Sequence, residues 1–131
     1  MNSVDSHTIQ AGEYPQTVRV RSHVLTSDVA QATGGQDSAP GPHDFFDTAL
    51  ATCKSMTAMW YAKRKGIPLE RVETHVESDD SAERTGVYRL RVRVALFGPL
   101  SDDQRADVLR AIAACPIHKL MTTSDVQIEM A

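Results

Sequence analysis

Apolar and polar residues alternate in four stretches of the chain, residues 17–25, 71–78, 87–97 and 126–130. Such alternation is typical of strands that bury one face and expose the other. The polar segment 79–86, between the second and third stretches, predicts a hairpin loop. One wet face and one buried face per strand indicate a mainly antiparallel sheet, with a further hairpin expected near the N-terminus.

A long helix is predicted from Pro42 to Lys65, because the run after Pro42 contains neither proline nor glycine until Gly66. Pro42 suits the first helical position, and Asp44 in the first turn complements the helix dipole. About 24 residues would span roughly 36 Å. The middle of this helix carries few charges, so we expect other parts of the protein, or a second subunit, to cover most of its sides.

A second helix is predicted after Ser101, which forms a capping box with Gln104. Pro116 ends that helix, because its ring cannot continue the backbone hydrogen bonds. Cys115 then lies at the N-cap of a short third helix that begins at Pro116. The predicted fold is α+β, a mainly antiparallel sheet packed with a long central helix and a second helix, in a single domain of residues 1–131.

Composition excludes several classes of function. The 131 residues carry a formal net charge of −3, so no basic field is present to hold nucleic acid. No apolar run approaches the roughly 20 residues of a membrane span. The first residues are polar, without the apolar core of an export signal, and we expect a cytoplasmic protein. In a reducing cytoplasm, its two cysteines serve packing, metal binding or redox chemistry, and composition does not choose among these.

The two cysteines lie in different predicted environments. Cys53 falls inside the apolar helix, where a cysteine is more often a small buried hydrophobe than a nucleophile. Lys54 is about 100° around the helix from Cys53 and is expected to point elsewhere. Cys115 at a helix N-cap faces unpaired N–H groups, which favour its thiolate. Cys53, Cys115 and His118 would supply three ligands to zinc, but no fourth ligand is evident, so we expect no metal.

Two motifs resemble those of a known family. Residues 41–53 (GPHDFFDTALATC) combine a proline-containing loop, an acidic residue, two large apolar residues, a run of small residues and a cysteine. Residues 115–119 (CPIHK) form a Cys-Pro-hydrophobic-His-Lys turn. Both motifs, with the spacing and order of the elements across residues 17–130, resemble the OsmC/Ohr family of osmotically induced and organic-hydroperoxide-resistance proteins.

The resemblance implies an OsmC-like intertwined homodimer that reduces organic hydroperoxides at its interface. Cys53 would be the thiol that attacks the peroxide, and Cys115 the thiol that resolves the resulting sulfenic acid to a disulfide. A dithiol, for example of the lipoyl type, would restore both thiols without any cofactor. The alternative is a dimer without enzymatic activity that senses redox state or binds a small hydrophobic ligand.

The family's glutamate, ten residues before the first cysteine, is replaced here by His43, and the nearest acid is Asp44. The arginine that steadies the thiolate in the family has two candidates, Arg19 and Arg21, predicted on one face of the first strand. Asp44 lies about 13 Å along the helix from Cys53, so within one helix its carboxylate cannot reach that sulfur. If Asp44 serves an active site, the site belongs to the partner subunit.

A candidate substrate pocket comes from the large apolar residues of the long helix. They could as easily form an ordinary core, as such residues more often do. The residues concerned are Phe45, Phe46, Met56, Met59 and Trp60.

Overall fold

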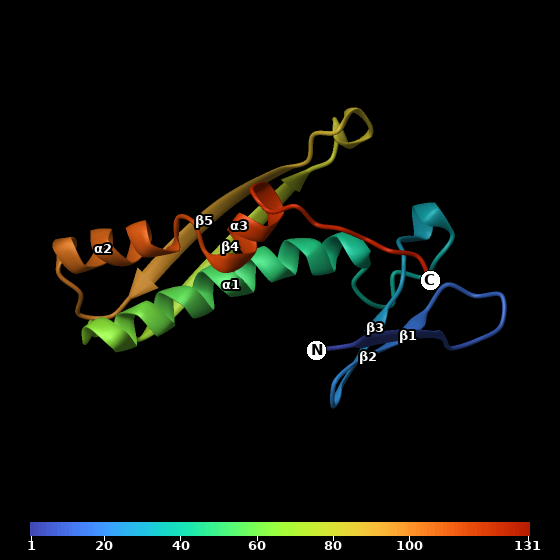
Figure 1. Ribbon diagram of the computed structural model, residues 1–131, viewed down its shortest axis with the longest axis horizontal. Helices are drawn as coiled ribbons and strands as arrows, with labels where there is room; N and C mark the ends of the chain where they lie inside the picture. Colours follow the sequence, from blue (N-terminus) through green and yellow to red (C-terminus); the bar gives the residue numbers. More distant parts are fainter. The chain divides into compact units, whose positions relative to one another are not determined.

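The computed structural model describes residues 1–131 and has an α+β fold with antiparallel strands (Figure 1). The chain forms two compact units, Met1–Phe46 and Asp47–Ala131. No helix combines the length and the apolar composition that a membrane span requires.

The first unit contains a three-stranded antiparallel sheet in the order β1-β2-β3. Its strands are β1 (Val4–Thr8), β2 (Gln16–Val20) and β3 (His23–Ser27), followed by the short 3-10 helix η1 (Gln31–Thr33). The expected N-terminal hairpin is therefore present as the pair β1 and β2.

The single strand predicted over residues 17–25 is wrong, because the chain reverses within it. Val20 pairs with His23, which leaves Arg21 and Ser22 as a two-residue turn. Arg21 adopts a positive φ of 54°, unusual for a residue other than glycine. Arg19 stays on β2, opposite Asp5 and Val24, so the two arginines do not share one strand face. Val18 and Val20 before the turn and Val24 after it fall in one every-second-residue series, so the sequence pattern gave no sign of the turn.

Asp28 organises the loop that follows β3. Its carboxylate is almost completely buried and accepts hydrogen bonds from the backbone N–H groups of Val29 (2.7 Å), Gln36 (3.2 Å) and Ser38 (3.0 Å), and from the Ser38 hydroxyl (2.7 Å). The hydrogen bonds from Ser38, side chain first, lower the pKa of Asp28 from 3.8 to about 2. One ionised carboxylate thus fixes a segment that contains no long element of secondary structure.

Helix α1 (Pro42–Lys65) begins and ends as the sequence predicts. Asp44 in its first turn accepts a hydrogen bond from the Gly41 N–H (2.8 Å), and Gly66 after its last residue adopts a φ of +65°. Every fourth residue along the middle of the helix is buried, and together these residues form one face. They are Leu50, Lys54, Ala58 and Ala62.

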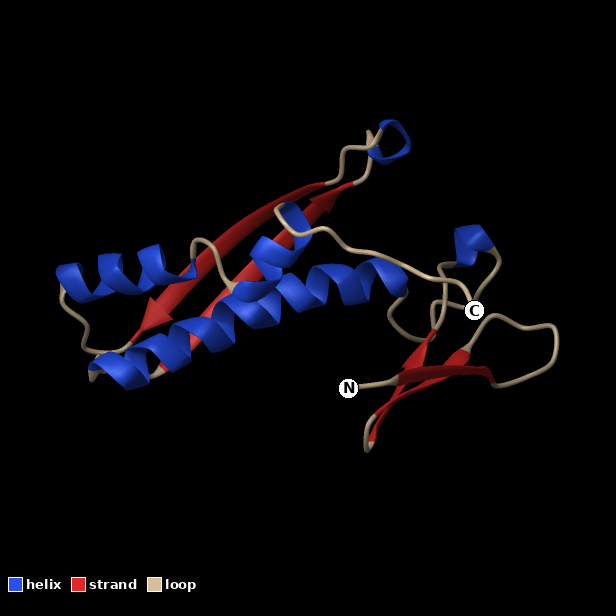
Figure 2. Ribbon diagram, viewed as in Figure 1, coloured by secondary structure: helices blue, strands red, loops and turns tan.

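The second unit joins most of α1 to a long hairpin and two shorter helices (Figure 2). Strands β4 (Arg71–Asp79) and β5 (Arg89–Phe97) pair in antiparallel fashion, and the turn of 3-10 helix η2 (Glu83–Thr85) lies between them. Helix α2 (Asp102–Ile112) has the predicted capping box of Ser101 and Gln104. Helix α3 (Pro116–Thr122) has Cys115 as its N-cap, also as predicted.

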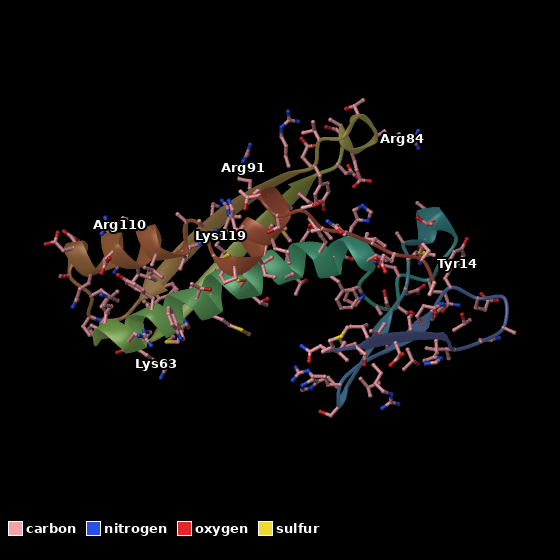
Figure 3. The ribbon with its side chains drawn as sticks, viewed as in Figure 1. Tyr14, Lys63, Arg84, Arg91, Arg110 and Lys119 are labelled. Carbon is pink, nitrogen blue, oxygen red and sulfur yellow. The ribbon has the colours of Figure 1, made fainter.

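The core of the second unit lies where α1, α2 and the hairpin meet. Ala58 and Ala62 of α1 are almost completely buried in this core, and Val108 of α2 is completely buried. Lys63, Arg91 and Arg110 instead place their charges on the outside of this unit (Figure 3). The buried members of the core are Ala58, Ala62, Ile67, Leu69, Leu96, Val108 and Ile112.

The closing strand predicted over residues 126–130 is absent. Val126, Ile128 and Met130 lie in a segment without regular structure, and all three are exposed. Alternation describes a strand only where the edge of a sheet supplies hydrogen bonds to it, and neither sheet pairs with this segment.

Candidate thiol active site

The two cysteines come together in the second unit although 62 residues separate them in the sequence. Cys53 lies in the middle of α1 and is partly buried, and Cys115 precedes α3 with 1% of its surface exposed. Both are free thiols, and their side chains are hydrogen-bonded to each other. A disulfide between them requires that the two sulfurs approach to about 2.05 Å.

Cys53 receives further hydrogen bonds from two directions. The hydroxyl of Thr57, one turn along α1, lies 3.8 Å from the Cys53 sulfur. The backbone N–H of Ile117, in the first turn of α3, donates to the same sulfur. This helix N-terminus was expected to favour the thiolate of Cys115, but the Cys115 side chain makes no capping hydrogen bond. The Ile117 N–H group instead donates to the Cys53 sulfur.

These contacts make the Cys53 thiol easier to ionise than an ordinary thiol. Burial alone raises the pKa of Cys53, because it disfavours the charged form. The hydrogen bonds from Ile117, Cys115 and Thr57, together with the nearby charge of Lys54, outweigh burial and hold the pKa of Cys53 below its ordinary value. A lowered thiol pKa in a partly exposed position is characteristic of a nucleophilic cysteine.

Lys54 is the member of the site that the sequence analysis missed. Only 5% of its surface is exposed, and its ammonium donates to the carbonyls of Ile112 (2.7 Å) and Ala113 (3.1 Å) and to Nδ1 of His118 (3.0 Å). Lys54 was expected to point away from Cys53, but its ammonium contacts the same segment, residues 112–118, that supplies Cys115 and the Ile117 N–H to Cys53, and its charge acts on the thiol. The available signal was its place in the buried i, i+4 series of α1, between Leu50 and Ala58.

An apolar hollow of about 380 Å³ lies beside the thiols, lined by Met56, Thr57, Trp60 and Pro116. Two of these residues, Met56 and Trp60, were predicted pocket residues, and both are well exposed at 69% and 59%. The guanidinium of Arg64 lies 5.1 Å from the centre of the Trp60 ring. A third predicted pocket residue, Met59, packs against the core instead.

The other predicted site residues belong to the first unit, so their presence at the thiol site stays a prediction. Arg19 is exposed on β2, and Arg21 lies in the turn that follows it. His43 and Asp44 are exposed in the first turn of α1, where the Asp44 carboxylate already accepts the Gly41 N–H. Phe45 and Phe46 follow in the same turn, and Phe46 is the more exposed of the two.

The thiols do not form part of a metal-binding cluster. No group of three or more histidine, cysteine, aspartate or glutamate side chains is arranged to hold a metal ion. His118, the ligand considered with Cys53 and Cys115, directs its Nδ1 at the ammonium of Lys54. A lysine cation at this distance opposes a second cation on the same nitrogen.

The fold and the site together define an α+β protein with a hydrogen-bonded pair of thiols, one of them made acidic by its surroundings. The family model for the OsmC-like protein matches residues 35–131, and the chain belongs to this family. None of the curated protein sequences is similar enough to the chain to count as a match.

Solved structures share the fold at low sequence identity. An OsmC-like protein from Mycoplasma pneumoniae is 19% identical with a TM-score of 0.75, over 94% of this chain and 88% of that one. An organic hydroperoxide resistance protein from Legionella pneumophila is 17% identical with a TM-score of 0.67, over 94% and 90%. The organic hydroperoxide resistance protein OhrB of Bacillus subtilis is 17% identical with a TM-score of 0.61, over 94% and 91%.

Proposed function

We propose that this protein is a cysteine-based peroxidase that reduces organic hydroperoxides to alcohols. The observation that carries the proposal is the thiol pair, in which a hydrogen bond from Cys115 contributes to the lowered pKa of Cys53. A nucleophilic thiolate with a second thiol in contact is the arrangement that a two-cysteine peroxidase needs. The names of the Legionella and Bacillus relatives, organic hydroperoxide resistance proteins, support the choice of substrate.

The reaction is written with Cys53 as the nucleophile. Its thiolate attacks the O–O bond of ROOH, an S–O bond forms as the O–O bond breaks, and the departing alkoxide takes up a proton to become ROH. The thiol of Cys115 then attacks the sulfenic sulfur of Cys53, the S–S bond forms, and the hydroxyl leaves with the thiol's proton as water. An external dithiol, of the lipoyl type in our proposal, supplies the two electrons that reopen the disulfide. Free thiols that cycle in this way fit a reducing cytoplasm.

The apolar hollow favours alkyl hydroperoxides over hydrogen peroxide. Met56 and Trp60 offer an apolar surface next to the thiols, where an alkyl chain loses contact with water. We keep Phe45 and Phe46 as further candidates for the same surface, contributed by a second subunit.

The functional unit is proposed to be a two-fold homodimer. Several apolar side chains on α1 are exposed, including Met56 and Trp60, and we expect a second subunit to cover them. The acid–base pair of the active site would then consist of Asp44 from one subunit with Arg19 or Arg21, and His43 would have a secondary role. We expect the dimer to bury more than about 2,000 Å² in total, which is the obligate class. A monomer at micromolar concentration in light scattering would exclude it.

The proposal is tested by following the consumption of cumene hydroperoxide with dihydrolipoamide as the reductant. The parent protein should turn over, Cys53→Ser should be inactive, and Cys115→Ser should stop after one equivalent of peroxide with a sulfenic acid at Cys53. Hydrogen peroxide at the same concentration should react more slowly than the alkyl peroxide. Equal, uncatalysed rates for the parent and Cys53→Ser would refute a peroxidase.

The alternative is a dimer without enzymatic activity that senses redox state or binds a small hydrophobic ligand. The substitution of the family glutamate by His43 is the observation that favours it. In that case the parent would form the Cys53–Cys115 disulfide with oxidants but would not consume hydroperoxide catalytically.

A further inference from the structure

Lys54 is buried, whereas the other three lysines of the chain, Lys63, Lys65 and Lys119, are exposed. Burying an ammonium is costly unless its donors are satisfied. An ammonium has three N–H donors, and Lys54 uses them on Ile112, Ala113 and His118. Because all three donors are used within the protein, Lys54 acts inside the structure and is not arranged to bind an anion from solution.

Two of the groups that accept hydrogen bonds from Lys54 are the carbonyls of Ile112 and Ala113, at the C-terminal end of α2. The last carbonyls of a helix lack partners within the helix and carry the negative end of its dipole. Glycine often ends a helix by letting the chain turn back, but Ala113 at this C-cap keeps a right-handed helical conformation. The ammonium of Lys54 takes the place of such a cap by donating hydrogen bonds to the Ile112 and Ala113 carbonyls.

The third acceptor lies on the other side of Cys115. His118 belongs to the first turns of α3, which begins at Pro116 directly after the cysteine. Lys54 therefore holds the chain at residue 113 and again at residue 118, and Cys115 lies between these two attachments. The residue that makes both attachments is the immediate neighbour of Cys53 on α1.

We propose that Lys54 is a positioning residue that holds the Cys115 turn against Cys53 and so sets the rate at which the two thiols join. This proposal rests on the proposed function, because disulfide formation between Cys53 and Cys115 is the second step of the proposed peroxidase reaction. It assigns to Lys54 the resolving reaction, in which the Cys115 sulfur attacks the oxidised Cys53 sulfur. The charge of Lys54 also favours the Cys53 thiolate, which supports its placement in the site.

The test measures this joining step without any peroxide, so it stands even if the peroxidase activity fails. A chromogenic aromatic disulfide, ArSSAr, first reacts with the Cys53 thiolate, forming Cys53–S–SAr and releasing one ArS⁻. The Cys115 thiolate then attacks the Cys53 sulfur, the Cys53–Cys115 disulfide forms, and a second ArS⁻ is released. Cys115→Ser should release one equivalent only and so identifies the second phase.

Lys54→Met should slow the second phase at least about tenfold, because a misplacement of about 1 Å can cost a hundredfold in rate. Lys63→Met, on the exposed side of the same helix, is the matched control and should stay within about twofold of the parent. Each variant is compared at a pH at which Cys53 is fully ionised, so that the charge of Lys54 no longer changes the thiolate population that reacts in the first phase.

His118→Ala serves as a second variant, because it removes only the attachment to α3 and leaves the cap of α2 in place. It should slow the second phase at least about threefold while circular dichroism shows an intact fold, and this result would keep the test valid if Lys54→Met does not fold. A second phase as fast as the parent's in folded Lys54→Met, or in His118→Ala when Lys54→Met does not fold, would overturn the proposal. So would an equal slowing of both phases, which would indicate general loosening of the structure.

Discussion

The hydroxyl of Thr57 offers the most direct test of how the structure tunes Cys53. Thr57→Val removes this hydroxyl and keeps the branched shape of the side chain. The hydroxyl lies 3.8 Å from the Cys53 sulfur, a long contact even for sulfur. We therefore place its contribution at the low end of the range for hydrogen bonds, about 0.5 kcal/mol.

This free energy converts directly into a change of thiolate population. A loss of about 0.5 kcal/mol of thiolate stabilisation raises the pKa of Cys53. Below that pKa the thiolate fraction should fall about two- to threefold. The hydrogen bonds from Ile117 and Cys115 are untouched, so the pKa of Cys53 in the variant should still lie below that of a free thiol.

The assay is the rate of alkylation by iodoacetamide between pH 5 and pH 9, with the modified cysteine identified by mass spectrometry. Cys115 is almost fully buried, so the rate reports Cys53. Thr57→Ser is the matched control, because it keeps the hydroxyl, and it should follow the parent. If Thr57→Val has the same pH profile as the parent, or if Thr57→Ser shifts as far as Thr57→Val, the hydroxyl does not stabilise the thiolate.

Three further outcomes are expected. Val108→Ala should lower the free energy of unfolding by about 2–3 kcal/mol in urea denaturation, since it removes two buried methyl groups and leaves a cavity. Leu109→Ala is the control: this residue is 41% exposed, and its replacement should lower the free energy of unfolding by less than about 1 kcal/mol. Asp28→Asn should lower the melting temperature at neutral pH; because the pKa of Asp28 is lowered from 3.8 to about 2, the difference from the parent should shrink as the pH falls from above 4 through 2, and a constant difference would contradict the carboxylate's role. Asp44→Asn should slow peroxide consumption at pH 7 more than His43→Asn, and the reverse order would show that the acid is wrongly assigned.

The sequence by itself determined the features that depend on neighbouring residues. Pro42 and Gly66 set the two ends of α1, and Ser101 with Gln104 set the start of α2, because caps act within a single turn. The pattern over residues 71–97 predicted a hairpin for the same reason, since alternation and a polar loop are local. The position of Cys115 at the start of α3 also followed from the proline beside it.

Tertiary structure decided what those elements do to one another. Lys54 bonds to residues 58 to 64 positions away, and no local pattern reveals a cation that replaces a helix cap at such a separation. The turn at Arg21 and the missing strand at residues 126–130 depended on which partners accept the backbone hydrogen bonds. The acidity of Cys53 likewise comes from the Ile117 N–H and the Cys115 thiol, groups that only the folded chain brings to its sulfur. Local sequence could place each thiol on its helix, but the balance of burial against hydrogen bonding that ionises one of them exists only after packing.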